Sequence, residues 1–116
     1  MKKVSELTGA ELDYWVAKAQ GCERVRLNLK GEYGNRTVYV DHVDVAGVGL
    51  FKPSSSWAQG GPIIEREKIA VCYDHLNEKW LAVIFGNPLI QTEGNTPLIA
   101  AMRCYVASVY GDTVSS

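Results

Sequence analysis

The stretch from residue 54 to residue 61 gathers residue types that bind small polar ligands. Trp57 offers a flat ring on which a base can stack, Gln59 offers an amide, and Arg66 follows with a guanidinium. The paired glycines in this stretch expose backbone N–H groups, which bind anions in many proteins, and a nearby helix start adds partial positive charge. The pattern predicts a site for a nucleotide-type small molecule.

A second helix start, at Asn95 and Thr96, has the same capacity to bind an anion. Arg103 lies two turns along that helix, at the margin of its apolar stripe, and is interpreted either as a surface side chain or as one that reaches into a pocket. The complete set of predicted ligand-binding residues is Ser55, Ser56, Trp57, Gln59, Gly60, Gly61, Arg66, Asn95, Thr96 and Arg103. The alternative, in which Trp57 anchors the core and the glycines only turn the chain, stays open at this point.

The remaining polar clusters lack the spacing of a catalytic or metal site. His42 and Asp44 share one face of a predicted strand, but two ligands do not make a metal site. The serines at 54–56 precede a helix, as capping residues do, without the strand-to-helix turn that carries a nucleophilic serine. Carboxylates such as Asp13 and Glu93 are available for acid–base chemistry, but their spacing selects no pair. We therefore predict no metal, no cofactor and no catalytic residue.

The size and charge of the chain exclude several classes of protein. Its 116 residues suit one domain spanning positions 1–116, and a composition of 47% hydrophobic and 22% charged residues is typical of a globular fold. A formal net charge of −1 lacks the basic surplus of DNA-binding domains, so a nucleic-acid partner is not favoured. Three distant cysteines, no signal peptide and no apolar run of about 18 residues predict an intracellular protein without disulfides or a membrane span.

Local patterns place a helix near each end of the chain. The first follows Thr8, and Asp13 is expected to point away from its buried face. Residues 86–95, rich in Gly, Pro, Asn and Thr, are expected to form a loop. The last helix begins at a cap and proline signal on Thr96 and ends at Gly111, after which the chain is expected to fray.

Alternating apolar residues predict two hairpins, one from residues 24–30 and 37–45 and the other from residues 69–73 and 79–85. The strand at 79–85 is apolar on both sides, which is typical of a central strand covered on two faces. A short helix is expected over 63–68, with an earlier start on one of the preceding serines as an alternative. The predicted fold is α+β, with an antiparallel four-stranded sheet from two hairpins and helices packed on it as an αβα sandwich.

Three stretches together resemble the NinX-like proteins of lambdoid phages. They are residues 1–19, 53–67 and 96–107, which read MKKVSELTGAELDYWVAKA, PSSSWAQGGPIIERE and TPLIAAMRCYVA. The central stretch is the most specific, and the hairpins match less clearly. The resemblance implies a product of the phage nin region, an accessory block expressed in the infected bacterium, and a fold similar to small phage αβα-sandwich domains. It implies no established activity.

The leading functional hypothesis is a non-enzymatic binding protein in the host bacterial cytoplasm that antagonises host antiviral defence by sequestering a nucleotide-derived signal. This step is an analogy with the role of other small phage proteins. A homo-oligomer is expected, joined through the small-residue face of the last helix, which is formed by Ala100, Cys104, Ala107 and Ser108.

Two other functions are alternatives. One is a hydrolase that acts on a nucleotide signal. The other is an accessory factor for DNA recombination or replication, which would contact DNA through the basic residues of the first hairpin, Arg24, Arg26, Lys30 and Arg36.

Overall fold

The structure is a computed structural model that describes residues 1–22, 25–28, 37–41 and 48–115; for the strands between residues 25 and 50 the backbone alone is described. The elements in chain order are β1 (Lys2–Lys3), the 3₁₀ helix η1 (Val4–Glu6), α1 (Gly9–Ala19), β2 (Val25–Asn28), β3 (Thr37–Asp41), β4 (Val48–Leu50), α2 (Trp57–Glu67), β5 (Ala70–Asp74), β6 (Lys79–Ile84), β7 (Ile90–Gly94), α3 (Pro97–Tyr110) and β8 (Thr113–Val114).

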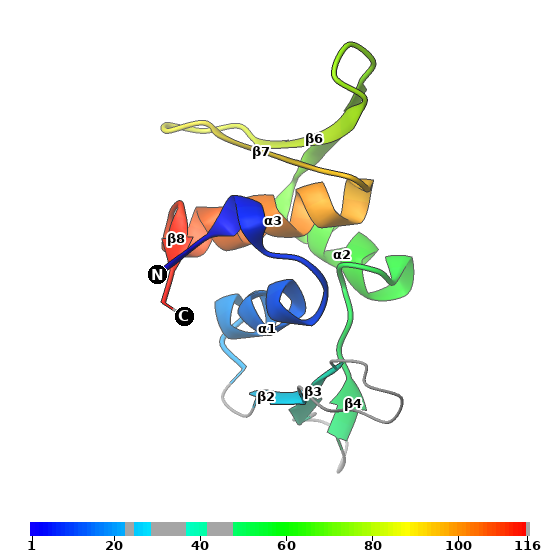
Figure 1. Cartoon of the computed structure of the whole chain (residues 1–116), viewed down its shortest axis with the longest axis vertical. Coiled ribbons are helices and arrows are strands. Elements are labelled where there is room, and N and C mark those ends of the chain that lie inside the picture. Colours follow the sequence, from blue (N-terminus) through cyan, green and yellow to red (C-terminus); the bar gives the residue numbers. More distant parts are fainter. Residues whose placement is uncertain (23–24, 29–36, 42–47, 116) are drawn as a thin grey trace.

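The helices lie between two sheets (Figure 1). Strands β5, β6 and β7 form one three-stranded antiparallel sheet, and β2, β3 and β4 form another. Helix α3 contacts the first sheet, helix α1 contacts α3, and β2 and β3 lie against α1. The α+β class is therefore confirmed. The predicted single four-stranded sheet is wrong, and the layers differ from an αβα sandwich, because the two hairpins belong to separate sheets on opposite sides of the helices.

Each predicted hairpin is present, and each gains a third strand that the sequence pattern did not predict. In the second hairpin Ala70 lies opposite Val83, and Asp74 lies opposite Lys79. Strand β7 then pairs with β6 inside the stretch 86–95 that was expected to be a loop. It is short and mostly polar, so its alternation is hidden among the turn residues around it. The sheet partner, rather than strand propensity, determines that this segment is extended.

Strand β6 lies in the middle of its sheet, as its two apolar sides predicted. On one side Ala82 is completely buried against the core. On the other side Leu81 and Val83 are half-buried, and Phe85 beyond the strand is 73% exposed. In the described part of the chain no helix lies on that outer side (Figure 1), so the predicted cover on both faces is not observed.

Helix α3 uses both of its sides within the chain. Its bulky residues join the core with α1, while the small-residue side packs on the sheet. The Thr92 hydroxyl donates to the Ala100 carbonyl oxygen at 2.7 Å, and the Cys104 thiol lies 3.7 Å from the Ile90 carbonyl oxygen. Ala100 and Cys104 are completely buried, so these two residues are not available for a contact between copies.

The two ends of the described chain meet in a two-stranded ribbon of β1 and β8. Lys2 lies opposite Val114, and the Val114 side chain is only 3% exposed. The predicted fraying after Gly111 is therefore wrong, because burial of this valine holds the last residues against the core.

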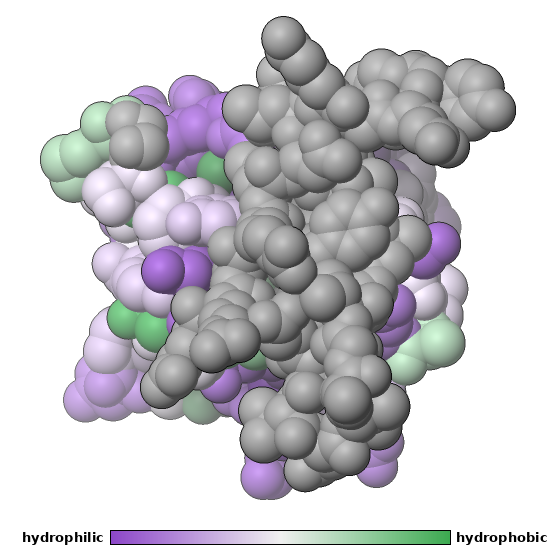
Figure 2. Space-filling view, turned by 90° about the horizontal axis from the view of Figure 1, so that it is seen from below, coloured by the Kyte–Doolittle hydropathy of each residue, from purple (hydrophilic) through white to green (hydrophobic). Residues whose placement is uncertain are grey.

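The face seen in Figure 2 offers no large apolar surface among the side chains that the structure describes. Those visible there are mostly hydrophilic or intermediate in hydropathy, and the apolar ones form small separate spots. Large contiguous apolar patches are the usual mark of a docking surface.

Helix α2 begins at Trp57, six residues before the expected short helix and at the earlier start that was left open. Gly60 lies inside this helix and is buried. A Cβ at this position would overlap the Pro53 carbonyl oxygen and come within 2.6 Å of Leu98 Cδ2. The glycine therefore allows the first turns of α2 and α3 to approach each other closely.

Replacing Gly60 and Gly61 by alanine is expected to have opposite effects on stability. Gly60→Ala forces a methyl group into backbone and should lower the free energy of unfolding by about 1–3 kcal/mol. Gly61→Ala is the matched control, since its Cβ would be 4.0 Å from Trp57 Cε3, and it should raise stability by about 0.5–1 kcal/mol through helix propensity. Urea unfolding measures both; equal effects would contradict the packing assigned to Gly60.

Candidate functional site

A buried hydrogen bond holds the turn before α2 against α1. The Ser54 amide donates to Asp13 Oδ1 at 2.8 Å, across 41 residues of sequence. Both residues are buried, with Asp13 only 5% exposed. The prediction that Asp13 points away from the core is therefore wrong, because a partner distant in sequence satisfies its carboxylate inside the protein.

Three hydrogen bonds to the backbone of Lys52 close the same turn. The amides of Ser55 and Ser56 both donate to the Lys52 carbonyl oxygen, at 3.1 and 2.9 Å. Gln59 Oε1 accepts from the Lys52 amide at 2.8 Å. Gln59, predicted as a ligand contact, thus uses its carbonyl oxygen to fix the turn. The position of Trp57 at the end of the turn is set by these contacts together with the Asp13 bond.

The environment of Asp13 favours its neutral form. Burial raises the pKa of this carboxyl to about 6, and hydrogen bonds from the Ser54 backbone and side chain offset only part of the increase. A carboxylate loses hydration on burial, and the hydrogen bonds from Ser54 replace only part of it. The anchor of the turn is therefore a titratable group whose charge changes at mildly acidic pH.

Trp57 is exposed, and its position leaves the ring open to a ligand. The side chain is 57% exposed at the first residue of α2. Ser56 occupies the N-cap position, but its side chain makes no capping hydrogen bond, and Ser55 is also exposed. The alternative in which this tryptophan anchors the core is therefore wrong. An exposed indole beside a helix N-terminus can stack a ring next to backbone donors.

The start of α3 lies next to this region. Thr96 caps α3 by accepting a hydrogen bond from the Ile99 amide at 3.1 Å, as its sequence signal predicted. Because Gly60 packs against Leu98, the first turns of the two helices are neighbours. The structure thus brings the exposed pair Asn95 and Thr96 to the same end of the molecule as Trp57.

The two glycines of the predicted site lie within helix α2 and do not form an anion-binding loop. The Gly60 amide donates to the Ser56 carbonyl oxygen at 2.7 Å, so it is engaged within the helix. Gly61 lies in the body of the same helix. The expected anion-binding concavity is therefore absent at these two residues, which form a regular helical turn. The sequence did not indicate this helix, because glycine and proline usually mark turns and loops.

Arg66 lies nine residues after Trp57 on α2, roughly 13 Å along the helix axis. Its guanidinium donates to Glu67 at 2.6 Å and lies 5.7 Å from the centre of the Tyr105 ring. Arg103 is a clamp instead of a ligand contact: it donates to the carbonyl oxygens of Leu7, at 2.9 Å, and Glu93, at 2.7 Å. The structure does not bring either arginine to Trp57.

Within the described ranges, no group of three His, Cys, Asp or Glu side chains is arranged to hold a metal ion. His42 and Asp44 lie outside the described residues, as do Arg24, Lys30 and Arg36 of the first hairpin, and the Arg26 side chain is not described. The hypotheses built on these residues stay predictions. The described arrangement at the start of α2 offers an aromatic face and helix-terminal donors, which suit binding.

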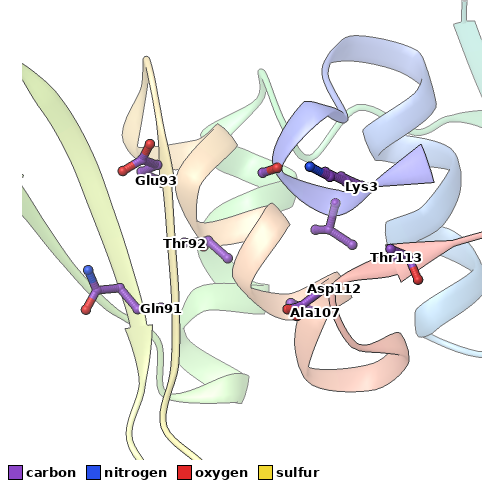
Figure 3. A pocket seen from close by; sticks show the side chains of 9 residues that line it. Lys3, Gln91, Thr92, Glu93, Ala107, Asp112 and Thr113 are labelled. Carbon is purple, nitrogen blue, oxygen red and sulfur yellow. The ribbon is translucent and has the colours of Figure 1, made fainter.

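A cleft of about 450 Å³ lies away from the predicted site, between β7, the end of α3 and the ribbon of β1 and β8 (Figure 3). Sequence reasoning missed it because its walls come from both ends of the chain. The pairing of β1 with β8 has no local signal, and β7 was expected to be a loop. Only the folded chain brings Lys3 and Asp112 to one cleft.

The family model described as "Bacteriophage P22, NinX" matches residues 3–109 of the chain. It thus covers α1, α2 and nearly all of α3. The resemblance inferred from the three sequence stretches is confirmed by this match. Among curated proteins, none matches the chain. No helix of the described residues has the length and apolar character to cross a membrane.

The raised pKa of Asp13 predicts how stability depends on pH. Between about pH 4 and pH 6 the folded protein keeps a proton on Asp13 that the unfolded chain has lost, so stability decreases as pH rises through this window and levels off above it. Relative to Asp13→Asn, which cannot ionise, the wild-type free energy of unfolding should fall by up to about 3 kcal/mol from pH 4 to pH 7.

Urea unfolding at half-unit pH steps measures this difference. Asp13→Ala separates the hydrogen bond from the charge, because it leaves the buried Ser54 amide without its acceptor and should cost about 1–3 kcal/mol. Parallel pH profiles for the wild type and Asp13→Asn would contradict the assignment.

Proposed function

We propose, from the premise that this chain belongs to the bacteriophage P22 NinX family, that it is a phage accessory protein that works by binding a ligand without catalysis. Family membership supports action inside an infected bacterium, and we place it in the host cytoplasm. The proposal assigns the binding surface to the shared end of α2 and α3, which we call the Trp57 surface: Ser55, Ser56, Trp57, Asn95 and Thr96.

The observation that carries this proposal is the exposed indole of Trp57. Large aromatic side chains are usually buried, and one that is held in the open by a buried anchor is typical of a contact residue. Here the anchor is the bond between Asp13 and Ser54, three residues before the ring. The fold thus fixes the position of an aromatic ring that the core does not use.

The ligand class that best suits the Trp57 surface is a nucleotide-derived small molecule. A base stacked on an exposed aromatic ring contributes about 1–3 kcal/mol. The adjacent starts of α2 and α3 bring two helix N-termini to the same end, and the dipole of each helix favours a phosphate there. Hydroxyl groups of Ser55 and Ser56 are close enough in sequence to add hydrogen bonds.

We further propose that binding sequesters a nucleotide signal of the host's antiviral defence. Membership in a phage family supports this step, by analogy with the role of other small phage proteins. Sequestration also needs no catalytic residue. The small-residue side of α3 packs on the sheet and takes no part in ligand binding. A homo-oligomer stays a prediction. The rival role in DNA recombination or replication rests on side chains that are not described.

Isothermal titration of the full chain with cyclic dinucleotides and ADP-ribose-type nucleotides tests the proposal. One of these should bind, and Trp57→Ala should weaken it by about tenfold or more because the stacking face is lost. Trp57→Phe should retain part of the affinity. Phe85→Ala is the matched control, since it removes another exposed aromatic ring that lies beyond β6.

The titration also separates binding from hydrolysis. Recovery of unchanged nucleotide by mass spectrometry after incubation is the expected result. No heat with any of these nucleotides, or equal binding by Trp57→Ala and wild type, would overturn the assignment of this surface. A changed nucleotide mass would establish the hydrolase alternative instead.

A further inference from the structure

The cleft beside β7 is lined on one side by this strand and on the other by Lys3 and Asp112, which lie at the ribbon of β1 and β8. Figure 3 shows that the Gln91 and Glu93 side chains point away from it. Strand β7 pairs with β6 on one side only, so its other edge is open, and residues 91–93 border the cleft. The lining residues are Lys3, Val4, Ser5, Gln91, Thr92, Glu93, Ala107, Asp112 and Thr113. None of the Trp57 surface is among them.

The direction of the β7 backbone follows from the Arg103 clamp. The Glu93 carbonyl oxygen accepts from Arg103, which lies on α3 and also donates to the Leu7 carbonyl oxygen. That carbonyl therefore points away from β6. In an antiparallel strand the N–H and C=O groups of residues two apart point the same way. The N–H and C=O of Gln91 consequently point to the open edge of β7, away from β6.

An open strand edge inside a cleft has a specific binding capacity. Exposed edges pair with other extended chains, and proteins usually block them. Here η1 and Arg103 block the edge at Glu93, while the edge at Gln91 borders a cavity of about 450 Å³. That volume is within the usual range of ligand sites, roughly 300–1,000 Å³. The open part of the edge suits a short extended segment of about three residues, roughly 10 Å long.

The charges around the cleft restrict the segment further. Lys3 lies across the cleft from β7 (Figure 3), is exposed, and has no ion-pair partner in the described part of the chain. Asp112 lies at the ribbon end. An acidic side chain is therefore favoured near Lys3, whereas a uniformly acidic segment is disfavoured by Asp112.

We propose that this cleft binds an extended peptide segment of another protein, which pairs with Gln91 at the open edge of β7 as a fourth strand and places an acidic side chain against Lys3. Backbone hydrogen bonds would supply affinity, and the charge would supply specificity, as in other cases of strand addition. The proposal is independent of the Trp57 surface, since it uses a different face and a different class of ligand.

Selection from a displayed library of random hexapeptides against the full chain supplies the probe. A selected peptide should contain an acidic residue, and Gln91→Pro should weaken its binding by about tenfold or more, because the edge N–H is lost and the ring enters the cleft. Gln91→Ala is the matched control, because it removes a side chain that points away and retains the N–H; it should bind as the wild type does. Lys3→Ala should weaken binding by about threefold.

A second measurement keeps the test independent of how well Gln91→Pro folds. Amide hydrogen exchange of the wild type should show slower exchange at Gln91 when the peptide is bound, with no change at Trp57. Trp57→Ala should bind the peptide normally, so failure of the nucleotide proposal leaves this result intact. Selection of no peptide, unchanged exchange at Gln91, or equal loss in Gln91→Pro and Gln91→Ala would overturn the proposal.

Discussion

The hydrogen bond between the Ser54 amide and Asp13 is the constraint on which the exposed end of the molecule depends. It joins α1 to the turn before α2 across 41 residues and is buried on both sides. Because burial makes the charged form of Asp13 unfavourable, the bond is retained at some cost in stability at neutral pH. The bond fixes Ser54, which lies three residues before the exposed Trp57.

Helix α3 is the element that both layers share. It contacts the sheet on one side and α1 on the other, and glycines allow the backbone to come close at two points. A Cβ at Gly94 would lie 2.7 Å from the Ala100 amide nitrogen, and Gly60 meets Leu98 with equally little room. At these two points no second chain can lie between α3 and its neighbours.

Features with a local cause were predictable from the sequence. The cap at Thr96 fixes the start of α3 through a neighbouring amide, and alternation fixes the hairpin of β5 and β6. Features with a distant cause were not. Asp13 is polar and lies on a helix, so only its partner on another segment explains its burial. At the candidate site, the burial of Gly60 depends on packing against Pro53 and Leu98, which no spacing rule includes.

The ribbon of β1 and β8 ties residues near position 2 to residues near position 114. Contacts this distant in sequence form late, because a long stretch of chain must be ordered before the pairing is rewarded. During synthesis β1 has no partner until Thr113 and Val114 have left the ribosome. The cleft that this ribbon borders is accordingly a feature of the finished fold, and a nascent chain lacks it even after α1 and the first sheet have formed.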